Sequence, residues 1–179
     1  MLETKRLLLR PFSLEDAPRV YELASVAEVA ATSLNIPHPY PEALAAEWIA
    51  GHPQGAKKGM HVFALTRKHD GQVIGGVSLG ITHRHNRAEL GYWIGLPYWN
   101  QGYATEAVVR MIQWGFDEHA LSRIFAQHFA CNPASGRVME KAGMTYEGTL
   151  RDCVCKDGTY HDTPMYSILH SEHSATLPA

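Results

Sequence analysis

The segment YWIGLPYWNQGYATEA, residues 92–107, combines residue types that could bind an anion. An apolar strand pattern ends near Ile94, and Pro97 prevents further pairing in a sheet. A turn with Gly102 then leads into a helical pattern, and a glycine lets a ligand approach the main chain closely. The N–H groups of residues 101–105 would have no partner inside the helix and would lie at the positive end of its dipole. The pattern predicts an anion site, with a tight turn that binds nothing as the alternative.

Cationic side chains are missing from this segment. No Lys or Arg lies between Arg87 and Arg110, so we expect main-chain amides, and not formal charge, to hold a bound phosphate. Two other phosphate-binding patterns are absent from the chain. There is no Gly-Lys-Ser/Thr ending of a Walker loop and no GxGxxG after the first strand. The sequence therefore excludes the common nucleotide-binding loops.

The surrounding elements follow from the periodicity of apolar residues. Strands are expected over residues 3–10, 60–67, 72–81, 88–95 and 123–130, and on both sides of a KDGT turn at 156–159. Helices are expected after an N-cap at Ser13, over 42–50, over 102–119, and over 134–142 before Gly143. The apolar stripe of the helix over 102–119 is expected to be Ala107, Val108, Met111, Ile112 and Phe116. This order of elements predicts one mixed α/β domain.

Composition narrows the class of protein. The 179 residues are 45% hydrophobic, which is enough for one packed core. A net charge of −2 argues against a nucleic-acid binder. No apolar run reaches the roughly 18 residues of a membrane span, and the first residues resemble no export signal. Three cysteines do not suggest a disulfide framework, so we expect a cytoplasmic protein.

Several stretches together resemble the GCN5-related N-acetyltransferase (GNAT) family. ELGYWIGLPYWNQGYATEA is similar to its motif (Q/R)xxGx(G/A), which in that family binds the pyrophosphate of coenzyme A. Three further stretches, TKRLLLRPFSLEDAPRVYEL, NPASGRVMEKAGMTYEGTLRD and DGTYHDTPMYSIL, resemble the RimJ/RimL branch, which acetylates N-termini of ribosomal proteins. One departure is Trp99 at the first motif position. The resemblance implies a GNAT domain over residues 3–169, followed by a C-terminal tail over 170–179.

The resemblance also implies a fold and a cosubstrate. The fold would be a single α/β domain with a mixed, mostly antiparallel sheet, flanked by helices, in which a central pair of strands splays apart. The pantetheine arm of acetyl-CoA would lie between the strand with Trp93 and the strand over 123–130, and no metal is expected. The cofactor-binding residues would be Trp93, Ile94, Asn100, Gln101, Gly102, Tyr103, Ala104, Thr105, Asn132 and Ser135.

Three residues are the catalytic candidates. The resemblance implies that Glu89 accepts a proton from the amine, with a purely structural carboxylate as the alternative. Ser135 would lie near the sulfur and protonate the leaving thiolate. Asn132 would bond a pantetheine amide, although an Asn before a helix also acts as an N-cap. Some RimL-like proteins carry a further Glu where this chain has Val154, which leaves Asp152 as the nearest substitute.

The acceptor is expected to be a primary amine that attacks the thioester directly. Deprotonation at pH 7 costs about 1 kcal/mol for an α-amino group and roughly 4.6 kcal/mol for a lysine. A protein N-terminal amine is therefore favoured, and a main-chain N–H near Ile94 would bind the oxyanion. A small amine (a polyamine, an aminoglycoside or an amino-acid-like compound) and a non-catalytic coenzyme A sensor are the alternatives. Tyr40, Trp48 and the loop over 36–41 are candidates for the acceptor pocket, and a homodimer is one assembly to consider.

The cysteines suggest no further chemistry. Cys153 and Cys155 would lie on one strand, and with His161 they lack a fourth ligand for zinc at a sensible spacing. Cys131 is expected to be a small, buried strand residue.

Overall fold

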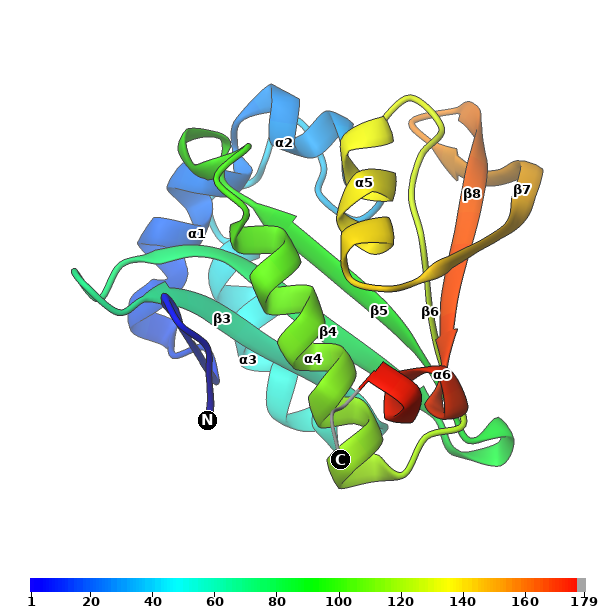
Figure 1. The fold of residues 1–179 in the computed structure, drawn as a ribbon. Coiled ribbons are helices and arrows are strands. Elements are labelled where there is room, and N and C mark those ends of the chain that lie inside the picture. The colour runs from blue at the N-terminus through cyan, green and yellow to red at the C-terminus, as the bar shows by residue number, and fades with distance from the viewer. Residues whose placement is uncertain (177–179) are drawn as a thin grey trace.

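An eight-stranded sheet crosses the computed structural model, which describes residues 1–176 (Figure 1). The strands are β1 (Leu2–Glu3), β2 (Leu7–Arg10), β3 (Met60–Arg67), β4 (Val73–Thr82), β5 (Arg87–Ile94), β6 (Arg123–Gln127), β7 (Thr145–Lys156) and β8 (Thr159–Leu169). Their order is β1-β2-β3-β4-β5-β6-β8-β7. Every neighbouring pair is antiparallel except β5–β6, which is parallel. The mixed, mostly antiparallel sheet is confirmed.

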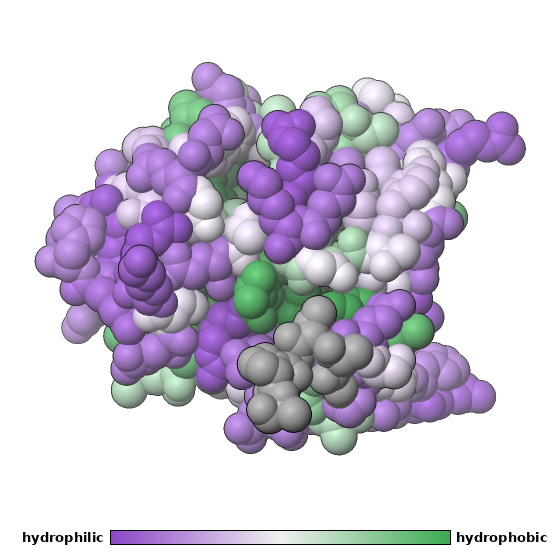
Figure 2. Space-filling view, viewed as in Figure 1, coloured by the Kyte–Doolittle hydropathy of each residue, from purple (hydrophilic) through white to green (hydrophobic). Residues whose placement is uncertain are grey.

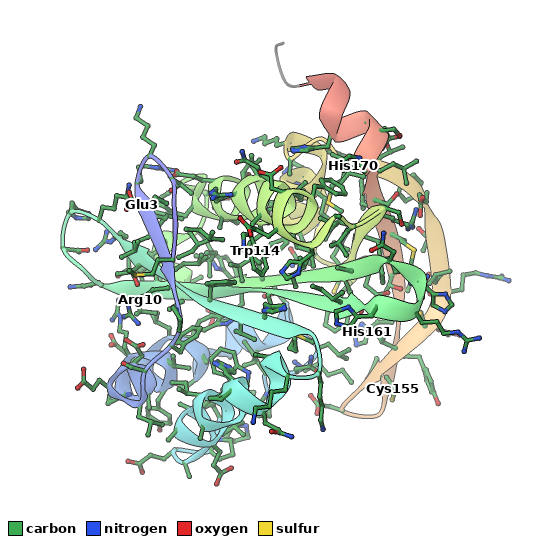
Figure 3. All side chains as sticks on the ribbon, turned by 90° about the horizontal axis from the view of Figure 1, so that it is seen from below. Glu3, Arg10, Trp114, Cys155, His161 and His170 are labelled. Atoms are coloured by element: carbon green, nitrogen blue, oxygen red, sulfur yellow. The ribbon has the colours of Figure 1, made fainter. Side chains whose placement is uncertain are left out.

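Helices cover both faces of this sheet. They are α1 (Ala17–Ala24), α2 (Ala27–Ala31), α3 (Leu44–Ala56), α4 (Tyr103–His119), α5 (Pro133–Lys141) and α6 (His170–Thr176), with short 3-10 turns at Leu14–Asp16, His83–His85 and Leu96–Tyr98. Figure 3 shows α4 on one side of the sheet and the blue and cyan helices α1–α3 on the other. On the face that carries α4 and α5, hydrophilic side chains cover most of the surface and hydrophobic ones gather in a hollow near its middle (Figure 2). None of the described helices is long and apolar enough to cross a membrane.

The long helix α4 forms because its apolar residues recur on one side. The five expected stripe residues are all 2% exposed or less and join the main core between α4 and the sheet: Ala107, Val108, Met111, Ile112 and Phe116. Each large aliphatic or aromatic side chain buried in this way contributes about 1.5–3 kcal/mol. The helix begins directly after Gly102, so burial of the stripe also determines where the preceding turn lies.

The central strands β5 and β6 separate part of the way along. They pair at only three positions, and the last of these joins Glu89 to Phe125. Beyond it β5 continues to Ile94 on the β4 side, while β6 ends at Gln127. The splayed strand pair expected in this fold is therefore present.

Three expectations about local structure were wrong. The strand over 3–10 is interrupted, because the hydroxyl of Thr4 accepts the N–H of Leu7 (2.8 Å) and closes a turn. Residues 170–176 of the expected tail form α6, whose first turn is capped where Leu169 N–H donates to the Glu172 carboxylate (2.8 Å). Residues 177–179 lie outside the described part of the chain. Cys131 is exposed in a turn, because β6 ends four residues before it.

A polar cluster joins the last three strands of the sheet, β6, β8 and β7. Arg123 on β6 makes a two-pronged ion pair with the carboxylate of Glu147 on β7. The Ser167 hydroxyl on β8 donates to the same carboxylate (2.8 Å). These contacts, above all the hydrogen bond from Arg123, lower the pKa of Glu147 to about 2. The ionised carboxylate therefore stabilises the folded chain.

We predict that Glu147→Gln lowers the free energy of unfolding by about 0.5–1 kcal/mol at pH 7. A carboxyl whose pKa is lowered by folding stabilises the protein above its ordinary value of 4.5, and this effect is lost as the pH falls toward 2. The difference between variant and parent in urea denaturation should thus shrink between pH 5 and about pH 3. Glu22→Gln, which breaks an exposed pair with Arg19, is the control and should change little. A difference that does not depend on pH would contradict the ion-pair explanation.

Candidate active site

Two pockets meet where β5 and β6 separate. The larger pocket has a volume of about 680 Å³ and lies between the sheet and the helices α1 and α3. The smaller pocket, of about 250 Å³, lies between the end of β5, the start of α4 and helix α5. Residues that line both pockets are Thr32, Ser33, Tyr92, Trp93 and Ser135. A ligand in one pocket can therefore reach a ligand in the other at Tyr92 and Ser135.

The turn before α4 forms one wall of the smaller pocket. Asn100 and Gly102 both have left-handed backbone conformations, with φ of 59° and 79°. No main-chain or side-chain acceptor within residues 1–176 receives the N–H groups of residues 100–105. Asn100, Gly102, Tyr103, Ala104 and Thr105 all line the pocket. The free donors and the N-terminus of a 17-residue helix make this wall suited to an anion.

Two side chains hold this turn in place from outside. The Arg6 guanidinium donates to the main-chain carbonyl of Gln101 (2.9 Å) and to the carboxylate of Glu106 (2.7 Å) in the first turn of α4. The indole N–H of Trp99 donates to the Ile94 carbonyl (2.7 Å), which ties the turn to the end of β5. Where the motif of the resembled family has a cationic or amide side chain, this chain has Trp99, whose hydrogen bond holds the turn against the end of β5.

Gln101 differs from its neighbours. Its side chain donates to the Pro97 carbonyl (2.8 Å), and the residue is not among those that line the smaller pocket. Any contact of Gln101 with a cofactor is therefore restricted to its main-chain N–H.

We expected main-chain donors alone at the anion site, but two cationic side chains line the same pocket. Arg137 and Lys141, both on α5, line the smaller pocket opposite the turn. Both are exposed, and neither has an ion-pair partner in the described chain. They are free to attract an anion that the main-chain donors bind.

The separated edge of β5 offers further main-chain groups. Gly95 N–H donates to the carbonyl of Ile74 in β4 (2.9 Å), and hydrogen bonds recur at every second residue of an antiparallel pair. By this alternation the main-chain groups of Trp93 face β4, whereas those of Tyr92 and Ile94 face the gap. The Ile94 carbonyl is occupied by Trp99. The main-chain contact that we expected at Trp93 is better assigned to Tyr92, together with the Ile94 N–H.

Ser135 and Tyr92 form a pair of hydroxyls at the meeting point. Their oxygen atoms are 2.6 Å apart, and the Tyr92 hydroxyl also donates to the Ser135 carbonyl (3.0 Å). Burial raises the pKa of Tyr92 to about 12, so this group stays protonated at neutral pH. Asn132 caps α5, as expected from its position before Pro133, and its side-chain oxygen accepts the N–H of Ser135 (3.4 Å). Asn132 also lines the smaller pocket, so capping and ligand binding are compatible.

The charged side chains that line the larger pocket are carboxylates. Glu89 and Glu47 line it, and no Lys or Arg does. The Gln127 amide donates to Glu89 (3.2 Å), and its own oxygen is buried without a partner in the described chain. Tyr40 and Trp48 line the pocket, as expected. This lining suits a cation with an apolar body.

Two histidines of the larger pocket have buried ring nitrogens without a partner in the described chain. They are both nitrogens of His52 and Nε2 of His128. Burial lowers the pKa of His52, so the neutral ring is favoured. Both rings could hydrogen-bond a ligand in the pocket.

The third catalytic candidate lies elsewhere. Asp152 lies in an irregular part of β7 with φ of 49°, its side chain is exposed, and its N–H donates to Asp162 (2.9 Å). It is not among the residues that line either pocket. The structure thus brings Glu89 and Ser135 together without Asp152. Within residues 1–176 no three His, Cys, Asp or Glu side chains are placed to hold a metal ion.

Comparisons with known proteins identify the family. Residues 6–145 match the family described as Acetyltransferase (GNAT) domain. An uncharacterized N-acetyltransferase of Bacillus subtilis, YoaA, is 32% identical over 171 residues, which is 94% of this chain and 96% of the relative.

Two solved structures share the fold. RimL, a ribosomal L7/L12 alpha-N-protein acetyltransferase in complex with coenzyme A, has a TM-score of 0.83 at 18% identity, with 93% of this chain and 95% of that chain covered. A spermidine N-acetyltransferase of Vibrio cholerae, in complex with CoA and spermine, has a TM-score of 0.80 at 21% identity, with coverage of 94% and 98%. The fold therefore occurs with both a protein N-terminus and a polyamine as acceptor.

Gly102 provides a test of the turn. We predict that Gly102→Val weakens coenzyme A binding at least tenfold by calorimetry, because a β-branched residue at φ of 79° would force the turn and its free N–H groups to move. Gly71→Val is the matched control. Gly71 has φ of 70° in the β3–β4 turn and has nothing within 4 Å of an added Cβ, so it should lose similar stability without a change in affinity. If both variants bound coenzyme A with the same affinity, the turn would not be part of the cofactor site.

Proposed function

Because the chain belongs to the GNAT acetyltransferase family and is an N-acetyltransferase, we propose that acetyl-CoA binds in the smaller pocket and a primary amine in the larger one. The observation that carries this assignment is the meeting of the two pockets at Tyr92 and Ser135. The free N–H groups of residues 100–105, with Arg137 and Lys141 opposite, would bind the pyrophosphate. The pantetheine arm would occupy the gap beside β5, where the main-chain groups of Tyr92 face no strand partner.

The reaction is a direct attack in a ternary complex. The neutral amine nitrogen forms a bond to the thioester carbonyl carbon, and the C–S bond breaks when the tetrahedral intermediate collapses. The Ile94 N–H would bind the oxyanion. The nitrogen loses its proton to Glu89 through a water, which the buried oxygen of Gln127 could also hold. The sulfur leaves as a thiolate and receives its proton through Ser135.

Tyr92 gives Ser135 a defined position in this scheme. The tyrosine hydroxyl lies within hydrogen-bond distance of both the hydroxyl and the carbonyl of Ser135. Tyr92, whose pKa burial raises to about 12, is protonated at pH 7 and donates to the Ser135 carbonyl. The Ser135 hydroxyl therefore remains as the donor to the departing thiolate. Tyr92 was missed in the sequence because it reads as an ordinary strand residue.

A protein N-terminal amine is the acceptor that we favour. An α-amino group loses its proton at a cost of only about 1 kcal/mol at pH 7, so one carboxylate reached through water is a sufficient base. The aromatic lining of the larger pocket fits an apolar first side chain, and its two carboxylates attract a cationic amine. The sequence resemblance to the RimJ/RimL branch supports the same acceptor.

A small cationic amine is the second candidate. The two carboxylates of the larger pocket, with no Lys or Arg among its lining residues, would also suit a polyamine. The apolar lining around them favours an amine that carries a single positive charge over one with several.

A thiol-release assay tests the proposal. The protein is mixed with acetyl-CoA and one of three acceptors: a peptide with an apolar first residue, a peptide with an acidic first residue, or spermidine. We expect release with the apolar peptide, little with the acidic one because of repulsion by Glu47 and Glu89, and less with spermidine. A preference for spermidine would select the second candidate. Coenzyme A binding with no release on any amine would overturn the proposal.

Glu89→Gln tests the proton acceptor. We predict that the variant lowers kcat about tenfold or more, because the neutral amide cannot accept a proton. Glu47→Gln is the matched control from the same pocket. It should raise the KM for the amine but leave kcat within about twofold. A kcat equal to that of the parent in the Glu89 variant would exclude Glu89 as the base.

A further inference from the structure

Lys156 makes an unusual set of contacts far from its own strand. Its ammonium group donates to three main-chain carbonyls, those of Ala30 (2.5 Å), Ser33 (2.5 Å) and Ile36 (2.8 Å). An ammonium has three donors, so all of them are used. The acceptors lie more than 100 residues earlier in the chain, at the end of α2 and in the loop that follows it.

The β7–β8 hairpin carries Lys156 to this loop. Its two-residue turn has Asp157 and Gly158 in left-handed conformations, with φ of 51° and 79°, which is the geometry of a tight hairpin. Figure 3 shows the end of the hairpin, near Cys155, on the side of the sheet where α1–α3 lie. Lys156 therefore links the last hairpin of the chain to the helices beside the larger pocket.

The residues that Lys156 holds form the rim of both pockets. We define the rim loop as residues 32–36. All five line the larger pocket, and Thr32 and Ser33 also line the smaller one. Within residues 1–176 the rim loop pairs with no strand, and the main-chain N–H groups of Thr32 and Ser33 donate to nearby carbonyls, those of Val29 and Ala30. Lys156 supplies the long-range contacts that fix it.

The chemistry of the contact suits a lysine. Main-chain carbonyl oxygens carry a partial negative charge, so an ammonium within hydrogen-bond distance of three of them is favourable. Burial opposes this by lowering the pKa of Lys156. Three charge-assisted hydrogen bonds offset that cost. Removal of the ammonium would leave three carbonyls without this donor and release the rim loop.

We propose that Lys156 is a positioning residue, which holds the rim loop in the conformation that receives the amine acceptor. This inference rests on the proposed acceptor role of the larger pocket. Lys156 touches neither pocket itself, so it acts through the rim loop and through no contact with the reacting atoms.

Hydrogen exchange tests the contact without any assay of activity. Lys156→Met keeps the length of the side chain and removes its donors. We expect amide exchange over residues 30–36 of the unliganded protein to rise at least fivefold in this variant. Lys68→Met is the matched control, because Lys68 also donates to a main-chain carbonyl, that of Thr4 (2.7 Å), but lies outside both pockets. Unchanged exchange over 30–36 would overturn the proposal.

Kinetics then separates positioning from general stability. Lys156→Met should raise the KM for the amine at least fivefold with kcat within about twofold, and Lys68→Met should change neither. Lys156→Arg keeps the cation and should fall between parent and Met variant. Loss of kcat with an unchanged KM would overturn the positioning role. A failure of the proposed function is a distinct result, since it would show as no thiol release by the parent protein itself.

Discussion

The separation of β5 from β6 after the Glu89–Phe125 pair is the constraint on which the site depends. A sheet normally satisfies its own N–H and carbonyl groups, and an interior strand with unpaired groups is costly unless something else pairs them. Here the unpaired edge runs past Tyr92 to Ile94, between two pockets that meet on it. In the proposed complex an extended ligand with amide groups would supply the missing partner. The cost of opening the sheet would thus be offset when such a ligand binds.

The elements around the gap each contribute a different kind of group. The start of α4 gives main-chain donors, α5 gives two cations and a hydroxyl, and the wall built by α1 and α3 gives aromatic surface. These kinds of group separate the two ligands by charge. Anion-binding groups lie on the side of the smaller pocket, whereas the ionised side chains lining the larger one are carboxylates. Phosphate groups would therefore be attracted to the smaller pocket and a cationic amine to the larger one.

Much of this arrangement was visible in the sequence, because it is local. The glycine turn, the apolar stripe of α4, the cap at Asn132 and the KDGT hairpin all depend on residues within a few positions of each other. The presence of Arg137 and Lys141 in the smaller pocket was not predicted, because they lie more than 30 residues beyond the turn in the sequence. The side chain of Gln101 and the conformation around Asp152 were also not predicted, although local structure decides both. A short-range hydrogen bond in the first case and an irregular strand in the second decide where those groups lie, and neither leaves a periodic signal.

The Arg6 guanidinium donates to the main-chain carbonyl of Gln101, a residue 95 positions further along the chain. This hydrogen bond requires the first strands to be docked beside α4, so the orientation of the turn depends on residues far from it in the sequence. A fragment that lacks the first ten residues would keep every glycine and amide of the motif but would lose the hydrogen bond from Arg6 that orients them. In the proposed complex, coenzyme A affinity would therefore depend on an edge strand of the sheet that lines neither pocket.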